Sequence, residues 1–312
     1  MNNIIWVNVL KGLGMLTVVA GHIYDGEISR NIYIFHMPLF FFISGFLFKP
    51  TDNYTYFFVK KLKSLLIPYF IFLIILYPYF YGYPSLKWNE ISTYLYKPII
   101  GGRLLGGPFA AFWFVTCLFL TQQLMNFLVT KFSCKKMNYI MLAFIVISSI
   151  NSYRSGLWLP WNAHVVFASS PFFYIGYSYQ KNTIKFNPII LFSMGILVLL
   201  FSSIYQNNIY DMKFTRYGYP IITLFSSIIL ILNFKNLAIY ITKIKQIEKV
   251  LSSIGKASLI IMFLHQPFQI LIKTYYTHNN NILFCASISL SYLFYFLFSK
   301  SKLTKKLFLG KE

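Results

Sequence analysis

Long apolar runs separated by short polar stretches make up most of the chain. A helix needs roughly 20 apolar residues to cross the hydrocarbon core of a bilayer. The runs predict ten membrane-spanning helices, at 4–23, 32–49, 64–82, 108–130, 138–151, 164–180, 187–205, 219–234, 257–275 and 281–299. No soluble domain, repeat or low-complexity tract interrupts them. We therefore expect an all-α polytopic membrane protein with a single domain over 1–312, ending in a short basic cytoplasmic tail at 300–312.

The composition agrees with this pattern and excludes an ordinary soluble domain. The chain is 57% hydrophobic, 21% aromatic and only 11% charged, with a mean hydropathy of +0.60, whereas a soluble domain is about 25% charged. The formal charge of +21 would suggest nucleic acid if it were taken alone. In a polytopic protein it indicates basic cytoplasmic loops, so we expect a lipid bilayer and no nucleic acid as partner.

The distribution of lysine and arginine predicts the orientation. If the N-terminus is cytoplasmic, 19 of the 28 basic residues lie in inside loops and 8 lie in outside loops. Lys11 is the remaining one, and it lies within the first predicted span. Because cytoplasmic loops carry the excess of lysine and arginine, this asymmetry favours ten spans with both termini in the cytoplasm.

Two polar residues in the first span, Lys11 and His22 in "KGLGMLTVVAGH", are the first candidates for chemistry. Eleven residues at 3.6 residues per turn bring both onto nearly the same helix face, about 16 Å apart along the axis. A charge at mid-bilayer costs roughly 2.5–3.5 kcal/mol, which makes a buried lysine a functional candidate. The alternative is that Lys11 extends to the inner surface and His22 caps the helix at the interface.

The second span, "IYIFHMPLFFFISGFLF", carries His36 near its external end, close to the expected depth of His22. Pro38, Ser44 and Gly45 interrupt the aromatic run where another backbone or a ligand can come close. We expect His36 to support the catalytic site and Ser44 to contribute to the binding of a cofactor. A structural histidine that donates to a backbone carbonyl is the alternative for His36.

Three lysines follow on the cytoplasmic side, Lys60, Lys61 and Lys63 in "FFVKKLKSLLIPYF". They are ordinary residues of an inside loop, or they hold the phosphates of a soluble cofactor. This predicted order, with cations in the cytoplasm, a lysine within the membrane and two histidines on the external side, fits the binding of a polyanionic acyl donor with a long arm. Acyl-coenzyme A is such a donor. A histidine can take the proton of an attacking sugar hydroxyl or carry the acyl group itself.

At these motifs the sequence resembles the acyltransferase-3 family of membrane proteins. The Lys-x10-His pair, "FHMPLFFFISGFLF" and the basic stretch before "LLIPYF" match its signatures, although many members carry Asp at the position of Asn8. The resemblance, closest to the fucose O-acetylase-like branch, implies transfer of acetyl from acetyl-CoA to a hydroxyl of a surface polysaccharide or its lipid-linked precursor. It also implies a bacterial plasma membrane, His22 as catalytic residue, and Lys11 and the loop lysines on the donor side.

Weaker family-like segments lie around Trp113, Asn162 and His265, and we expect these residues to bind the acceptor. Tryptophans are also common in aromatic belts, and His265 can be a structural histidine. Three distant cysteines match no metal-ligand spacing, so no metal is expected.

The main rival is a transporter or flippase of envelope glycans, in which Lys11 and the histidines would line a substrate path. We found no inverted repeat and no matched pair of broken helices, which are the sequence signs of many transporters.

Overall fold

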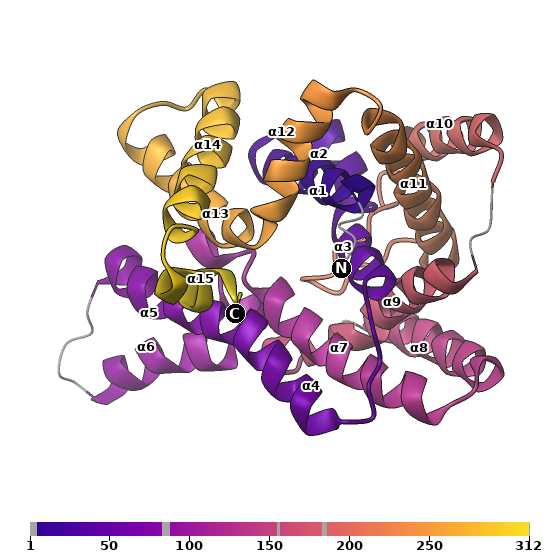
Figure 1. Ribbon diagram of the computed structural model, residues 1–312, viewed down its shortest axis with the longest axis horizontal. Coiled ribbons are helices and arrows are strands. Elements are labelled where there is room, and N and C mark those ends of the chain that lie inside the picture. Colours follow the sequence, from indigo (N-terminus) through magenta and orange to yellow (C-terminus); the bar gives the residue numbers. More distant parts are fainter. Residues whose placement is uncertain (1–4, 83–87, 155–156, 183–185, 312) are drawn as a thin grey trace. The chain divides into compact units, whose positions relative to one another are not determined.

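The structure is a computed structural model that describes residues 5–82, 88–154, 157–182 and 186–311. Every regular element in these ranges is a helix (Figure 1), and their one extended pairing is an isolated bridge between Asp211 and Arg216. The α-helices are α1 (Ile5–Ile23), α2 (Gly26–Tyr33), α3 (His36–Phe46), α4 (Tyr54–Lys61), α5 (Ile67–Tyr81), α6 (Trp88–Ile100), α7 (Trp113–Lys131), α8 (Cys134–Arg154), α9 (Val166–Lys181), α10 (Pro188–Ile204), α11 (Pro220–Ile241), α12 (Lys245–Lys256), α13 (Ser258–Tyr275), α14 (Asn280–Phe298) and α15 (Lys302–Leu309). A π-helical turn, Leu62–Leu66, joins α4 to α5, and short 3-10 turns lie at Gly102–Leu104, Gly107–Phe109 and Pro160–Val165.

Each of the ten predicted spans overlaps an α-helix over most of its length. Among the described residues, five continuous helical stretches are long and apolar enough to cross a membrane: Ile5–Ile23, Tyr54–Tyr81, Gly107–Lys131, Pro220–Ile241 and Asn280–Phe298. The protein is therefore an all-α membrane protein, as the hydropathy predicts. The cytoplasmic placement of its termini stays a prediction.

The second predicted span is broken near its start, because α2 ends at Tyr33 and α3 begins at His36. Pro38 lies in the first turn of α3, where the missing backbone N–H costs nothing. The carbonyl of Ile34, which an N–H at position 38 would otherwise reach, accepts a hydrogen bond from the Ser227 hydroxyl. The break therefore leaves no unsatisfied group at Ile34.

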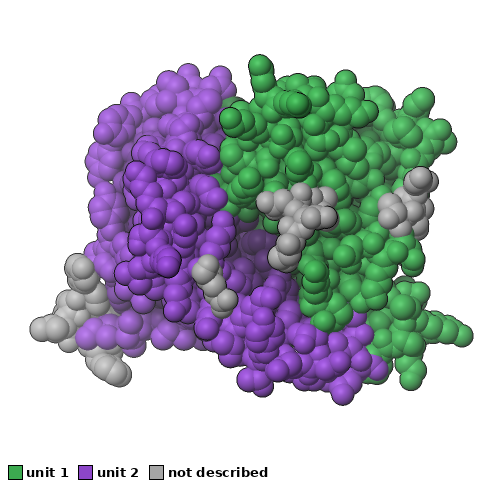
Figure 2. Space-filling model, viewed as in Figure 1, with its two compact units in different colours: residues 1–50, 132–157, 167–258 green, residues 51–131, 158–166, 259–312 purple. Residues whose placement is uncertain are grey.

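The chain divides into two compact units (Figure 2). Unit 1 comprises residues 1–50, 132–157 and 167–258, and unit 2 comprises residues 51–131, 158–166 and 259–312.

Two glycine contacts determine how the helices of unit 1 pack. Gly12 of α1 faces the backbone of Leu251, and Gly255 of α12 faces the carbonyl of Asn8, so that α1 and α12 lie side by side (Figure 1). A Cβ at either glycine would collide with the facing backbone. Small residues permit this close approach of helices in membranes, and here it places α12 beside the helix that carries Lys11 and His22.

Aromatic contacts and one paired amide hold unit 2 together. Phe72 of α5 stacks on Phe263 of α13 at 4.9 Å between centroids, and Phe298 stacks on Phe308 at 4.1 Å. The predicted basic tail thus contains the helix α15, which packs through Phe308. The Asn126 side chain accepts from the N–H of Thr51 and donates to its carbonyl, which fixes the chain just before α4.

Candidate active site

The two histidines of unit 1 that the sequence predicts on the external side both pack against one tyrosine. His22 lies in the last turn of α1, Tyr33 ends α2, and His36 begins α3. The Tyr33 ring is 6.4 Å from the His22 ring and 4.7 Å from the His36 ring, with edge-to-face geometry in both pairs. The structure therefore brings together the two histidines that the sequence singles out, and the break between α2 and α3 is what turns His36 toward Tyr33.

The two histidines differ in environment. His36 is 3% exposed, and its Nδ1 lies 2.9 Å from the carbonyl of Ile32. Since a carbonyl only accepts, Nδ1 carries the proton and Nε2 keeps its lone pair. His22 is only partly buried, so that its imidazole is the more accessible of the two. His22 is therefore the better placed of the two to exchange a proton with a substrate.

Lys11 lies on α1 between the buried residues Leu10 and Gly12 and is itself partly exposed. Met15 and Val18 follow along the helix face toward His22, and each is 1% exposed. The face that joins Lys11 to His22 is thus turned to protein and not to lipid. Ser44 of α3 belongs to the same unit, next to Gly45, which faces the Phe173 carbonyl of α9. The sequence predicts that another backbone or a ligand can come close at this position, and in the structure the backbone of Phe173 does so at Gly45.

A loop that the sequence did not single out docks on the histidine cluster. The backbone N–H of Tyr210 donates to the carbonyl of Tyr33 at 3.1 Å, and the Asp211 carboxylate interacts electrostatically with the Tyr33 hydroxyl. Lys213, in the same loop, is 8% exposed. Burial lowers the pKa of Lys213 to about 8 against the opposing effect of Asp211, and burial raises the pKa of Asp211.

Lys235, which the loop count assigns to a cytoplasmic loop, lies on α11, a helix that is long and apolar enough to cross a membrane. Its Nζ donates to the Tyr179 hydroxyl of α9 at 2.7 Å, and the side chain is 8% exposed. From the sequence, the segment "NLAIYI" after Lys235 either extends the eighth predicted span or forms an interfacial segment, and in the structure α11 continues through it to Ile241.

In unit 2, the three lysines that the sequence predicts on the cytoplasmic side lie at the junction between α4 and the π-helical turn. Lys60 and Lys61 end α4, and Lys63 lies in the π-helical turn Leu62–Leu66. Such turns are frequent at functional sites. Lys60 and Lys63 are exposed and Lys61 is partly exposed, and their binding of phosphate stays a prediction.

The three acceptor-side candidates are all buried in unit 2. Trp113 is 4% exposed, and Asn162 and His265 are fully buried. Asn162 has a left-handed backbone, with φ of 55°, and its Oδ1 accepts from the N–H of Arg103 at 2.9 Å. The Nδ1 of His265 donates to the Ile261 carbonyl at 2.6 Å. These contacts support the surrounding loops and helices, while the binding roles stay predictions.

The site residues thus fall into two sets. Lys11, His22, His36 and Ser44 belong to unit 1, and Lys60, Lys61, Lys63, Trp113, Asn162 and His265 belong to unit 2. No group of three metal-ligating side chains is found in the part of the chain that the structure describes.

The apolar all-α scaffold defines a membrane protein, and unit 1 holds a histidine pair within it. A family model described as an acyltransferase domain matches residues 4–300. The chain therefore belongs to the acyltransferase-3 family and is a membrane acyltransferase. Comparisons with curated proteins and with solved structures gave no match.

Proposed function

We propose that the protein is an O-acyltransferase that moves acetyl from cytoplasmic acetyl-CoA to a hydroxyl of a cell-surface polysaccharide or its lipid-linked precursor, in a bacterial plasma membrane. The observation that carries this proposal is the partly exposed His22 of an acyltransferase-3 chain, held with His36 around Tyr33. A histidine is suited to the reaction because its unperturbed pKa of about 6.5 lies close to neutral pH.

His22 acts as general base in this proposal. Its imidazole takes the proton of the acceptor hydroxyl as the sugar oxygen attacks the thioester carbonyl. The carbon–sulfur bond then breaks, and the imidazolium returns the proton to the leaving thiolate, so that atoms and charge balance. The α1 dipole stabilises the imidazolium that forms between these two steps.

His36 and Tyr33 support this residue. The hydrogen bond from His36 to Ile32 fixes the plane of the His36 ring, and the Tyr33 ring packs edge-to-face on both imidazoles. Two like charges side by side would disfavour protonation of His22. A buried, neutral His36 therefore keeps His22 able to accept a proton.

The lysines and Ser44 serve the donor. Lys60, Lys61 and Lys63 bind coenzyme A phosphates as point charges, and Lys11 and Ser44 position the arm that carries the acetyl group. Trp113, Asn162 and His265 shape the acceptor side. Because they are buried, they act by holding backbone segments such as the one around Arg103.

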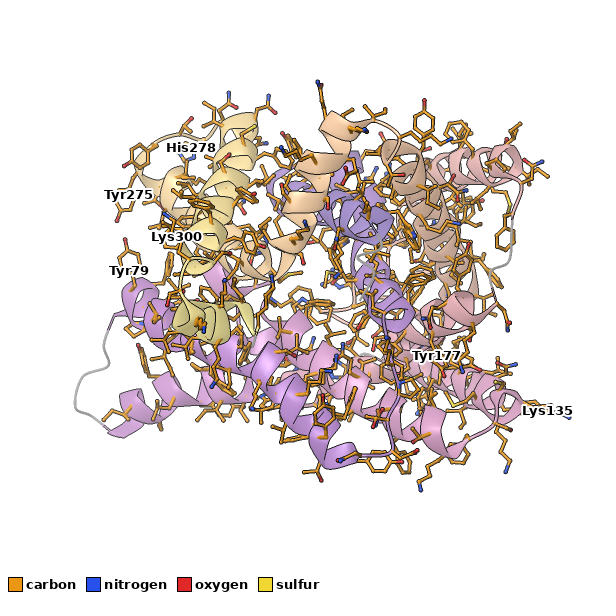
Figure 3. All side chains as sticks on the ribbon, viewed as in Figure 1. Tyr79, Lys135, Tyr177, Tyr275, His278 and Lys300 are labelled. Atoms are coloured by element: carbon orange, nitrogen blue, oxygen red, sulfur yellow. The ribbon has the colours of Figure 1, made fainter. Side chains whose placement is uncertain are left out.

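The test is acetylation by membranes that contain the full chain, supplied with labelled acetyl-CoA. We expect His22→Ala to reduce acetylation of the glycan by at least about 100-fold, the usual contribution of a general base, at an unchanged level of protein. His278→Ala is the matched control, because His278 is exposed on the loop between α13 and α14 (Figure 3). Full acetylation by His22→Ala would overturn the assignment.

A further inference from the structure

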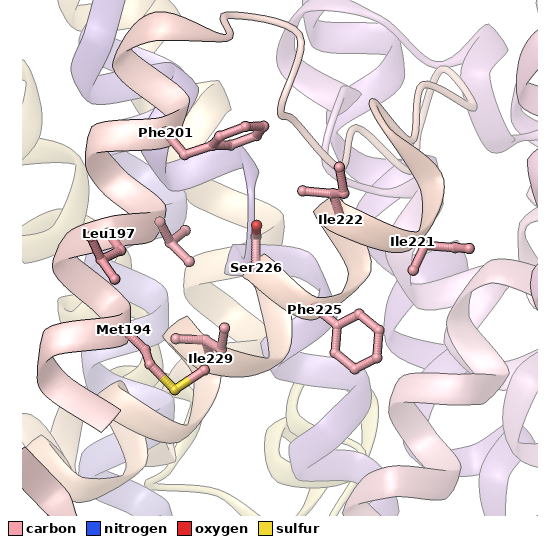
Figure 4. A pocket seen from close by; sticks show the side chains of 9 residues that line it. Met194, Leu197, Phe201, Ile221, Ile222, Phe225, Ser226 and Ile229 are labelled. Atoms are coloured by element: carbon pink, nitrogen blue, oxygen red, sulfur yellow. The ribbon is translucent and has the colours of Figure 1, made fainter. Parts of the chain in front are cut away.

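An apolar groove runs between α10 and α11 in unit 1 (Figure 4). Its volume is about 350 Å³. One wall is formed by α10 and the other by α11, through the side chains of Met194, Leu197, Val198, Phe201, Ile221, Ile222, Phe225, Ser226 and Ile229. From Met194 to Phe201 the groove is roughly 10 Å long at 1.5 Å per residue.

The groove is open toward an apolar surface. Leu197, Ile221 and Phe225 are 63%, 66% and 58% exposed. Ile221 and Phe225 lie on α11, which is long and apolar enough to cross a membrane, and Leu197 lies on α10, a shorter apolar helix. Apolar side chains exposed in this way face hydrocarbon and not water. The occupant that reaches this groove is therefore a hydrocarbon chain.

A polar floor and an aromatic cluster distinguish one end of the groove, the end nearest the 205–219 loop. There Ser226 accepts a hydrogen bond from the Asn208 amide, which also donates to Ser202. Asn208 is 1% exposed, and its Oδ1 has no hydrogen-bond partner among the described residues. Phe201 and Tyr205 stack beside it at 4.5 Å. A plain alkyl chain needs no such end, whereas a lipid with a polar head does.

The loop beyond this end carries the matching charge. Lys213 Nζ and the Arg216 guanidinium lie 5.4 and 5.6 Å from the centroid of the Phe214 ring, and this ring is 50% exposed. Because this loop joins α10 to α11, the two cations lie at this end of the groove, and together with Asp211 they give the loop a net charge of +1. Phosphate is the head group that two such cations complement.

The same loop connects the groove to the histidine cluster. Tyr210 donates its N–H to Tyr33, whose ring touches both His22 and His36. Tyr210 and Tyr217 stack at 4.8 Å, and both are buried, which fixes the base of the loop. A head group bound to the two cations is thus held on the loop that docks beside the proposed general base.

We propose that the α10–α11 groove binds the hydrocarbon chain of a phosphate-bearing lipid acceptor, with the phosphate on Lys213 and Arg216. This inference rests on the proposed function, of which it specifies the acceptor: a glycan still attached to its lipid carrier. It assigns the α10–α11 hairpin to recognition of that carrier.

The test is photo-crosslinking to the purified full chain in phosphatidylcholine nanodiscs. The probe is a polyprenyl phosphate with a diazirine in its chain, and unlabelled polyprenyl phosphate is the competitor. We expect crosslinks on α10 and α11 that the competitor removes, as mapped by mass spectrometry. We further expect the unlabelled alcohol, which lacks the phosphate, to compete at least about tenfold less well, as loss of charge-assisted hydrogen bonds predicts.

Variants test the two halves of the site separately. Leu197→Trp fills the groove and is expected to weaken probe binding at least about tenfold. Leu199→Trp is the matched control, because Leu199 is 40% exposed on the same helix and points about 200° away. Ile229→Trp fills the groove from α11, so that agreement of the two variants excludes a local folding defect. Lys213→Gln together with Arg216→Gln is expected to abolish the preference for phosphate over alcohol.

Two results would overturn the inference: labelling by a diazirine phosphatidylcholine that is equally strong and indifferent to the competitor, or equal probe binding by Leu197→Trp and Leu199→Trp. Binding does not require acetyl transfer, so His22→Ala is expected to bind the probe normally. Competed labelling without any acetyl transfer would contradict the proposed function alone. Acetyl transfer that depends on His22, without competed labelling, would contradict the lipid site alone.

Discussion

At the scale of single residues, the buried Lys213 links stability to pH. Its pKa is lowered to about 8 because burial disfavours the ammonium, with Asp211 acting in the opposite direction. Below pH 8 the ammonium is charged in both the folded and the unfolded chain, so the full burial penalty is present. Above the unfolded pKa of about 10.4 the amine is neutral in both, and the penalty is gone.

Lys213→Met is therefore expected to stabilise the protein at pH 7, by at most about 3 kcal/mol for a shift of this size. The gain should shrink as the pH rises from 8 to 10.5. Thermal unfolding of the detergent-solubilised wild type and variant, compared across this range, measures it. Asp211 and Arg216 are the other charged groups of the loop, and both are kept in the variant. A gain that is independent of pH would contradict the prediction.

The sequence identifies polar residues within apolar runs, but it does not identify charged loop residues that become buried only through long-range contacts. Lys11, His22 and His36 stand out because polar side chains are rare in apolar runs. Lys213 and Asp211 lie in a loop, where charged residues are ordinary. Their burial depends on the docking of Tyr210 on Tyr33, more than 170 positions away in the chain, and no local pattern encodes that contact.

At the scale of helices, the contact between α1 and α12 depends on the absence of a side chain at Gly12. Gly12→Ala is expected to destabilise the protein by about 1–3 kcal/mol, the usual effect of overpacking, because its Cβ would meet the backbone of Leu251. Gly106→Ala is the control, since a Cβ there has no atom within 4 Å. Thermal unfolding of both variants measures the difference, and equal midpoints would refute the packing argument.

The α4 end and the π-helical turn make a second prediction at this scale. Replacing Lys60, Lys61 and Lys63 together by Gln is expected to raise the KM for acetyl-CoA at least about tenfold with little change in kcat, because charge-assisted bonds to phosphate are lost. Lys135→Gln, on an exposed lysine at the start of α8 (Figure 3), is the control. If both proteins show the same KM, these three lysines do not bind the donor.

Helix positions were predictable because hydropathy follows the bilayer thickness, and all ten predicted spans hold helices. The interruption between Tyr33 and His36 was not predicted, although Pro38 marks a helix start. The packing of α12 on α1 was not predicted either. Its closest contacts join Gly12 to Leu251 and Asn8 to Gly255, and these residues are far apart in the sequence.

At the scale of the whole molecule, the charge asymmetry makes the orientation testable by labelling. In a background without the three native cysteines, Phe214→Cys is expected to react with a membrane-impermeant maleimide in intact cells, because Phe214 is 50% exposed on the predicted outside. Lys135→Cys, on the predicted inside, should react only after permeabilisation. The reverse pattern would invert the topology and place the histidine pair on the cytoplasmic side.

The bond between Lys235 and Tyr179 also bears on how the chain is inserted. A lysine that enters the bilayer alone costs roughly 2.5–3.5 kcal/mol. Tyr179 lies on α9 and is synthesised before Lys235 on α11, so the hydroxyl partner is already in the membrane when the lysine arrives. The order of helices along the chain thus provides the hydrogen-bond acceptor before the donor, so that the Lys235 ammonium can be hydrogen-bonded as soon as α11 enters the bilayer.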